Sequence, residues 1–351
     1  MSVFKFCSEL KIGQSKVAQG QPTYIIAEAG VNHNGKMELA YQLIDVAVEA
    51  GADAVKFQLF HTDELILQNV EKAPYQQGDT ADKESQYQML KGLEISIDNC
   101  RELKAYCEKK GITFLVTPFD LVSLAELKTL GLDALKISST DLTNTMFLQQ
   151  AASFGIPVIL STGMSEKSEV ERALEAIQPL NSQVVLLQCT SSYPAPESQI
   201  QLSVINRYKQ DYQVLVGYSD HSVGIGVSPY AVAAGAMLIE KHFTLDKSLP
   251  GPDHQASLSP DELKHFVAQI RQVDMMMGDG IKAVQLCEEP NRRSLQKSLV
   301  ARCFIGKGEL FTAENMVAKR TGGSGISSVH SSQILGLRAS ADFAPGELIY
   351  V

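Results

Sequence analysis

Two histidines in the carboxyl-terminal half of the chain could together hold a metal ion. His221 lies in GYSDHSVG (217–224) and His242 lies in IEKHFTLD (239–246), 21 residues further on. At that separation they cannot share one helical turn, so only the fold can bring them together. Imidazole suits first-row divalent ions, and two protein ligands leave positions open for water and substrate. We expect the alternative, a hydrogen-bonded core or surface residue, for His33, His61, His254, His265 and His330.

Other side chains that could do chemistry also stand at the ends of short apolar segments. In chain order they are Glu28, Lys56, Gln58, Thr117, Lys136, Ser161, Cys189, Asp220, His221 and His242. Buried strand positions normally avoid Lys, Glu and His, because desolvating these groups is costly. Their repeated occurrence at one end of the segments predicts the rim of an active site. For each lysine the alternative is a surface residue with a buried stem and a hydrated ammonium group.

The elements that must position these residues alternate between strands and helices. Eight short β-branched runs read as strands covered on both faces: 22–28, 52–58, 111–118, 132–138, 156–162, 183–189, 212–220 and 236–243. Helical patterns lie between them, most clearly at 37–52, 96–111 and 165–177, with a Ser–x–x–Asn start at Ser96 and Ser165 as an expected N-cap. Eight such units in about 260 residues predict an α/β fold, the (β/α)₈ TIM barrel. A dinucleotide-binding open sheet is disfavoured, since AGVNHNG rather than GxGxxG follows the first strand.

Composition excludes several other classes of protein. The formal charge is 31 − 40 = −9, which argues against a nucleic-acid binder, although a local pocket can still be cationic. No apolar run approaches the roughly 20 residues that span a membrane, and the first residues do not resemble a signal peptide. The six cysteines show no CxxC pair. We therefore expect a cytoplasmic protein with reduced thiols and no membrane partner.

The chain changes character after Gly280. We predict a barrel domain over 1–281, a linker over 282–296, where periodicity is weak, and a small β-rich domain over 297–351. Within the small domain, IGKGELFT is echoed by FAPGELIY, which suggests a pseudo-repeat of short strands and turns.

Many short motifs of the chain resemble the sialic acid synthase family. They are AEAGVNHNG, VKFQ, TPFD, LSTGM, CTSSYPAP, GYSDHS, EKHFTLD, GPDHQASLSPDEL and KRTGGSGIS, in the family's order from about residue 22 to the end. The resemblance implies a TIM barrel with a C-terminal antifreeze-like (SAF) domain. It also implies a domain-swapped homodimer, in which the small domain closes over the barrel of the second subunit.

The reaction implied by the resemblance joins phosphoenolpyruvate to an N-acetyl hexosamine, typically N-acetylmannosamine, with loss of phosphate. Mn²⁺ or Mg²⁺ assists, and the positions of the metal ligands match His221 and His242. A Lewis acid would polarise the aldehyde of the sugar. The positions that hold phosphoenolpyruvate, a small anion, match Lys56, Thr117, Lys136, Ser139, Ser161, Ser191 and Ser219.

The resemblance also assigns residues to the sugar and to the water that adds to carbon 2. Asp141 matches the catalytic carboxylate, although most bacterial relatives have Glu there, and its alternative is the N-cap of a helix at 142–154. The positions that bind the sugar match Glu28, Gln58, Tyr193, Asp253 and, from the small domain, Arg320. His33 stands in a loop that lines the site in the family. Ser191 replaces a common Asn, and Thr321 replaces the usual proline after Arg320.

Three alternatives remain open on the sequence alone. The closest is a legionaminate synthase, which uses a 2,4-diacetamido-6-deoxy sugar in place of N-acetylmannosamine. A TIM-barrel metallohydrolase would need further carboxylate or histidine ligands and has no need of two rim lysines. A non-catalytic sugar- or ice-binding protein is suggested only by the small domain.

Overall fold

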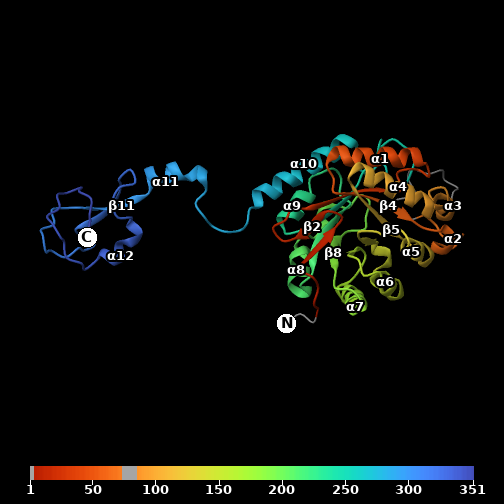
Figure 1. Cartoon of the computed structure of the whole chain (residues 1–351), viewed down its shortest axis with the longest axis horizontal. Helices are drawn as coiled ribbons and strands as arrows, with labels where there is room; N and C mark the ends of the chain where they lie inside the picture. The colour runs from red at the N-terminus through yellow and green to blue at the C-terminus, as the bar shows by residue number, and fades with distance from the viewer. Residues whose placement is uncertain (1–3, 73–84) are drawn as a thin grey trace. The chain divides into compact units, whose positions relative to one another are not determined.

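The computed structural model describes residues 4–72 and 85–351 (Figure 1). The chain divides into two compact units between Asp279 and Gly280. The first unit contains the predicted barrel and the second contains the small β-rich fold. Within the described residues, no helix combines the length and the apolar character needed to cross a membrane.

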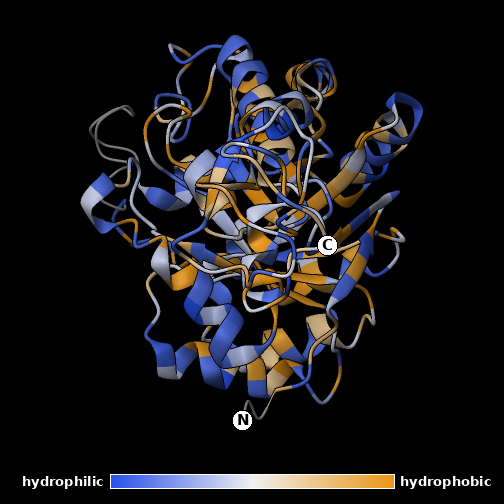
Figure 2. Cartoon of the chain, turned by 90° about the vertical axis from the view of Figure 1, so that its left-hand side faces the viewer, coloured by the Kyte–Doolittle hydropathy of each residue, from blue (hydrophilic) through white to orange (hydrophobic). Residues whose placement is uncertain are grey.

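Eight parallel strands form the barrel, as the sequence predicted. They are β3 (Tyr24–Gly30), β4 (Ala54–Leu59), β5 (Thr113–Pro118), β6 (Leu135–Ile137), β7 (Val158–Ser161), β8 (Val184–Cys189), β9 (Leu215–Asp220) and β10 (Leu238–His242). Hydrogen bonds join them in the order β5-β4-β3-β10-β9-β8-β7-β6, and β5 also contacts β6, which completes the ring. The strands carry mostly hydrophobic residues, whereas the helices also carry hydrophilic ones (Figure 2).

Helices follow the strands and cover the outside of the sheet. The main helices, one after each strand in chain order, are α1 (Met37–Ala50), α4 (Ile97–Lys110), α5 (Leu121–Leu127), α6 (Thr145–Ala152), α7 (Lys167–Ile177), α8 (Ser203–Tyr212), α9 (Ser228–Ala233) and α10 (Pro260–Met277). The short ones are α2 (Thr62–Leu65), α3 (Gln86–Lys91), η2 (Ser139–Asp141) and η3 (Glu197–Gln199). Their apolar faces pack on the outward-facing strand residues, and this interface is the largest core of the molecule.

Inward-facing residues form two layers inside the barrel, because side chains alternate along a strand. The lower layer is apolar and includes Ile26, Ala54, Leu115, Ala134, Ile159, Leu187 and Leu238. A hairpin of β1 (Glu9–Ile12) and β2 (Ser15–Ala18) adds to this cluster and lies near the start of β5. The residues two positions further along the same strands are Glu28, Lys56, Thr117, Lys136, Ser161, Cys189 and Glu240.

Helix caps agree with the sequence in one case and correct it in two others. Ser96 and Asn99 form the predicted reciprocal capping box of α4. Helix α7 begins after Glu166, so the predicted N-cap at Ser165 is wrong. Helix α6 is capped by Asn144, whose side chain accepts a hydrogen bond from the Phe147 amide, so the alternative role of Asp141 as a helix N-cap is also wrong.

The second unit begins with a segment in which the sequence predicts a linker and no helix or strand. Within 282–296 the chain forms η4 (Leu286–Glu288) and α11 (Glu289–Leu295), followed by β11 (Lys297–Ala301), β12 (Met316–Arg320), η5 (Ser328–His330) and α12 (Ser331–Ile334). The pseudo-repeat is visible in the hydrogen bonds. Ile305 and Phe343 exchange backbone hydrogen bonds. The side-chain carboxylate of Glu309 accepts a hydrogen bond from the Gly306 amide, and that of Glu347 accepts one from the Ala344 amide in the same way.

Candidate active site

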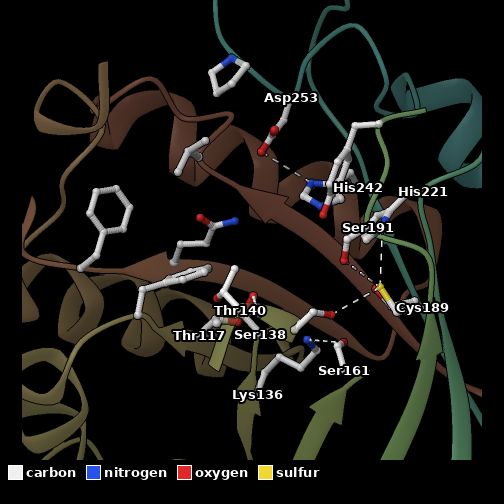
Figure 3. Close-up of a pocket in the computed structure, with 18 of the residues that line it drawn as sticks. Thr117, Lys136, Ser138, Thr140, Ser161, Cys189, Ser191, His221, His242 and Asp253 are labelled. Carbon is white, nitrogen blue, oxygen red and sulfur yellow. Dashed lines mark hydrogen bonds and ion pairs between the residues drawn. The ribbon is translucent and has the colours of Figure 1, made fainter. Parts of the chain in front are cut away.

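A cavity of about 380 Å³ opens at the carboxyl end of the barrel strands (Figure 3). The predicted site residues that line it are Lys56, Gln58, Thr117, Lys136, Ser139, Ser161, Ser191, Tyr193, Ser219, His221, His242 and Asp253. Strand alternation explains much of this convergence, since Lys56, Thr117, Lys136 and Ser161 each lie two positions after an inward apolar residue of the lower layer. Side chains far apart in the sequence therefore share one pocket.

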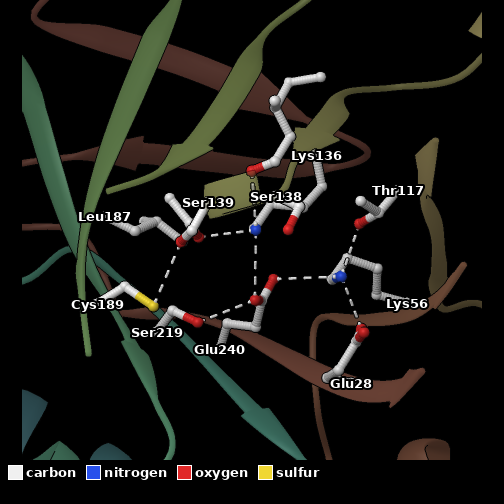
Figure 4. Close-up of polar contacts among 12 residues, drawn as sticks. Glu28, Lys56, Thr117, Lys136, Ser138, Ser139, Leu187, Cys189, Ser219 and Glu240 are labelled. Carbon is white, nitrogen blue, oxygen red and sulfur yellow. Dashed lines mark hydrogen bonds and ion pairs between the residues drawn. The ribbon is translucent and has the colours of Figure 1, made fainter. Parts of the chain in front are cut away.

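The floor of the pocket is a network of buried charges (Figure 4). We use the word floor for Glu28, Lys56, Lys136 and Glu240. The Glu28 carboxylate lies 2.9 Å from the Lys56 ammonium, and the two Glu240 oxygens lie 3.8 Å from Lys56 and 3.5 Å from Lys136. Both lysine side chains are at most 4% exposed, so the alternative of a hydrated surface ammonium group is wrong. Glu240 thus holds the two cations close together.

Hydroxyl groups surround this floor. The Lys56 ammonium donates to Thr117 Oγ1 at 2.7 Å, and the Lys136 ammonium donates to Ser161 Oγ at 2.8 Å. Ser219 Oγ donates to Glu240 at 3.1 Å. The first two bonds give each lysine a hydroxyl partner in addition to its carboxylate neighbours, so cations and hydroxyls lie together, which suits a small oxyanion.

Gly163 makes room for two of the pocket serines. Its amide donates to Ser139 Oγ at 2.9 Å. A Cβ atom at this position would lie 2.1 Å from Ser191 Oγ and 2.9 Å from Ser139 Oγ, closer than real contacts allow. The glycine of LSTGM is therefore required by close approach of the backbone to the pocket.

Burial and mutual attraction compete in setting the charges of the floor. Burial raises the pKa of Glu28 to about 7, against the attraction of Lys56. Burial also disfavours the ionised form of Glu240, but Lys136 and Lys56 outweigh it and lower its pKa to about 2. The pKa of Lys56 is raised, because its carboxylate neighbours outweigh desolvation, whereas desolvation lowers that of Lys136. One carboxylate is therefore firmly ionised and the other can be protonated near neutral pH, which leaves the floor able to accept an anion.

The two histidines lie side by side at the mouth of the pocket, with ring centroids 5.7 Å apart. Nδ1 of His221 donates to the Thr190 carbonyl at 2.9 Å, so Nε2 is the nitrogen that would bind a metal ion when the ring is neutral. His242 Nδ1 is buried without a hydrogen-bond partner and lies 3.9 Å from the Asp253 carboxylate. Burial, followed by repulsion from His221, lowers the pKa of His242 well below its usual value, so this imidazole is neutral.

The two histidines could supply only part of the coordination sphere of a metal ion. A neutral imidazole and a buried nitrogen without a partner are suitable ligands. Among the described residues, no group of three or more His, Cys, Asp or Glu side chains is arranged to hold an ion. Solvent or substrate oxygens would have to supply the remaining ligands.

The four residues matched to the sugar on the barrel lie around these histidines. Gln58 Nε2 donates to Glu28 Oε1 at 3.3 Å, which connects the floor to the mouth. Glu28 is buried beneath the pocket and is not among the lining residues. The Tyr193 ring lies 4.1 Å from the His221 ring. Burial raises the pKa of Asp253 to about 6.

Four other sequence-predicted residues lie outside the lining of the pocket. One of them is Asp220, which ends β9 and accepts hydrogen bonds from Ser222 and Ser228. Asp141 is the last residue of η2, and its side chain is buried beside the pocket. Its neighbours Ser139 and Thr140 line the cavity. Burial raises the pKa of Asp141 to about 6, although Thr140 donates to its carboxylate at 3.1 Å. His33 is fully buried, accepts a bond from the Gly35 amide and does not line the pocket. Arg320 ends β12 in the second unit and is exposed.

Sequence reasoning missed two features of the pocket. The first is Glu240, which stands in IEKHFTLD. Its position two residues before His242 places both side chains on one face of the strand. The second feature is an apolar wall, by which we mean Val31, Phe60, Leu65, Ile66, Leu90 and Phe119, all of which line the cavity. Phe60 and Phe119 continue the alternation of β4 and β5, but no periodic signal marks the other wall residues, which lie in loops and short helices.

A TIM barrel whose pocket joins two lysines, several hydroxyls and two histidines is typical of an enzyme acting on a small anion. Comparisons with known proteins agree. The NeuB family pattern matches residues 43–282. The N,N'-diacetyllegionaminic acid synthase of Campylobacter jejuni is 46% identical over 93% of this chain and 98% of its own length. The human N-acetylneuraminate-9-phosphate synthase is 35% identical over 89% and 87%.

A solved structure gives the same result. The N-acetylneuraminic acid synthetase of Leptospira borgpetersenii superimposes with a TM-score of 0.75 at 38% identity, over 83% of this chain and 98% of that one. The chain therefore belongs to the NeuB family of sialic-acid-type synthases and is a phosphoenolpyruvate-utilising transferase.

Proposed function

We propose that this enzyme condenses phosphoenolpyruvate with a 2,4-diacetamido-6-deoxy sugar, forming N,N'-diacetyllegionaminic acid and phosphate. The sequence alone favoured N-acetylmannosamine as the sugar and kept this reaction as the alternative. The alternative has more support, since the Campylobacter enzyme of that name is 46% identical to the chain, against 35% for the human sialic acid phosphate synthase.

Phosphoenolpyruvate would lie on the floor of the pocket, and the floor is the observation that carries the proposal. Lys56 and Lys136, held together by Glu240, offer two buried ammonium groups to a carboxylate and a phosphate. The hydroxyls of Thr117, Ser139, Ser161, Ser191 and Ser219 line the same part of the cavity. Charge-assisted bonds from buried donors are stronger than neutral ones.

The charges of the pocket favour a sugar without a phosphate group. Among the lining residues that the structure describes, the cationic side chains apart from the two histidines are Lys56 and Lys136, and both belong to the floor. A second phosphate on the sugar would find no further ammonium or guanidinium group in this part of the pocket. This argues for a neutral sugar rather than a sugar phosphate.

We further propose that His221 and His242 hold a Mn²⁺ or Mg²⁺ ion, with Asp253 next to the second ligand. When bound, the ion would act as a Lewis acid toward the aldehyde oxygen of the sugar. In the condensation, carbon 3 of phosphoenolpyruvate forms a bond to the aldehyde carbon, water adds to carbon 2, and inorganic phosphate leaves. Asp141 is our candidate for the carboxylate that takes the proton from that water.

The metallohydrolase alternative has less support. A metallohydrolase would need additional metal ligands, and within the described residues no cluster of three suitable side chains exists.

The role of the second unit as an antifreeze-like domain of a homodimer, with Arg320 reaching the pocket of the second subunit, remains a prediction. So does the cytoplasmic location.

The test is phosphate release from phosphoenolpyruvate with Mn²⁺ present, measured across a panel of sugars. We expect release with the 2,4-diacetamido-6-deoxy sugar at a higher kcat/KM than with N-acetylmannosamine or its 6-phosphate. Preferential use of either of the latter two would contradict the proposed sugar. Release with none of them would contradict the reaction.

A further inference from the structure

The apolar wall has no role in the chemistry of the floor or of the histidines. It lies beside them, because strand alternation continues past the polar layer. Lys56, Gln58 and Phe60 follow one another at every second position along β4 and its end, and all three line the cavity. Thr117 and Phe119 repeat the pattern on β5, where the Phe119 amide donates to the Leu59 carbonyl at 3.1 Å and extends the ladder.

The wall is a packed and braced surface. The rings of Phe60 and Phe119 meet edge to face at 6.3 Å, and Leu65 and Leu90 pack on the same small cluster. Polar contacts tie α2 to α3 and to the segment after it. Glu94 accepts from the Thr62 amide at 2.6 Å, and Lys91 bridges Asp63 and Glu94 at 3.1 and 3.2 Å. These contacts join α2, α3 and the ends of β4 and β5 into one packed unit around the apolar side chains.

The position of the wall selects one end of the sugar. The strand order β9-β10-β3-β4-β5 places the histidines on one side of Glu28 and Gln58, and the wall on the other. If the aldehyde carbon lies near the histidines, the distal carbons extend past Gln58 toward Phe60. An apolar surface rewards methyl groups there and gives no partner to a hydroxyl.

We propose that the apolar wall is the subsite for the C6 methyl group and the C4 acetamido methyl group of the sugar, and that it is the main determinant of sugar choice. This inference rests on the proposed function and adds to it the residues that set its specificity. A wall of this kind cannot fully exclude a hydroxyl-bearing analogue, but it prefers the methyl group by roughly tenfold or more.

The first test uses the unaltered enzyme and two 2,4-diacetamido sugars that differ only in carrying a methyl or a hydroxymethyl group at C5. We expect kcat/KM to be roughly tenfold or more higher for the methyl sugar. The second test uses Leu90→Gln and Leu65→Gln, which place a polar amide in the wall. We expect the KM for the methyl sugar to rise roughly tenfold, while the KM for phosphoenolpyruvate stays unchanged.

Leu67→Gln is the matched control, because Leu67 follows the same short helix but is 80% exposed and does not line the cavity. Its constants should equal those of the unaltered enzyme. Equal use of the two sugars, together with unchanged sugar KM values in both wall variants, would overturn the inference and leave the proposed function intact. Phosphate release with N-acetylmannosamine but with neither diacetamido sugar would overturn the proposed function, and the inference with it.

Discussion

The floor and the apolar wall meet along β4, since Lys56 belongs to the floor and Phe60 to the wall, yet the two regions are built in different ways. The floor consists of strand residues in the closed part of the barrel, where hydrogen bonds fix the backbone and burial makes each charge depend on its partner. The wall begins at the ends of β4 and β5, with Phe60 and Phe119, and is completed by residues from α2 and α3, outside the sheet. The comparison suggests that the barrel preserves the chemistry common to a family, while the loops adapt the pocket to one substrate.

The largest effect should come from the two histidines. We expect His221→Ala or His242→Ala to lower metal-dependent turnover by about 10³-fold or more, since a Lewis acid contributes several kcal/mol to such reactions. Binding of Mn²⁺, followed by the electron paramagnetic resonance signal of the free ion, should weaken in parallel. His265→Ala is the control, because His265 is exposed on α10. Full turnover of the unaltered enzyme in a chelator would refute the metal site.

The floor can be tested with two variants, one that removes a cation and one that removes an anion. Lys136→Ala should lower kcat/KM for phosphoenolpyruvate by about 10²-fold or more, because it removes a buried cation from the anion site. Glu240→Gln should destabilise the free protein by about 3–5 kcal/mol, since it leaves two ammonium groups without their shared counter-ion. In that variant phosphoenolpyruvate should raise the melting temperature by more than it does in the unaltered enzyme, because the ligand supplies the missing negative charge.

Lys109→Ala serves as the control for the floor, since Lys109 is exposed on α4. An unchanged KM for phosphoenolpyruvate and an unchanged kcat in Lys136→Ala would show that the anion does not bind between the lysines. A smaller thermal shift in Glu240→Gln than in the unaltered enzyme would contradict the proposed role of Glu240.

A smaller effect, on the order of 10²-fold in kcat, is expected for Asp141→Asn. The pKa of Asp141 is raised by burial to about 6, so a base at this position becomes active as the pH rises through about 6. The free energy of unfolding should change with pH in the opposite direction. The folded state favours the protonated carboxyl, and this contribution is present below about pH 4 and is lost as the pH rises through about 6. Asp141→Asn should therefore flatten both the rate and the stability profile between those values.

Asp253→Asn separates this effect from that of the other carboxyl whose pKa is raised to about 6. A rate profile that keeps its rise near pH 6 in Asp141→Asn, but loses it in Asp253→Asn, would transfer the proposed base to Asp253.

The barrel and much of its pocket could be predicted from the sequence for a physical reason. Lysine, glutamate and histidine are rare in buried strands, so Lys56, Lys136 and His242 at strand ends indicate function and location together. Glu240 carries the same signal, since it is a buried carboxylate two positions before His242 on the same strand. The caps at Glu166 and Asn144 could not be read as securely, since several polar residues stand before each helix.

The wall could not be predicted in this way. Phe60 and Phe119 look like ordinary core residues, and Leu65 and Leu90 lie on helices of four and six residues, too short for a clear period. Only the contacts in three dimensions show that these side chains reach the cavity. Asp141 illustrates the reverse case, since the motif selects it but its side chain is buried beside the lining rather than within it.

The claim that floor and wall each receive one substrate is tested most directly by the Michaelis constants of both substrates in Lys136→Ala and Leu90→Gln. Lys136→Ala should raise the KM for phosphoenolpyruvate and leave that for the sugar close to its original value. Leu90→Gln should do the opposite. If both variants changed both constants to the same extent, the two regions would not be separate subsites and the division of the pocket would be wrong.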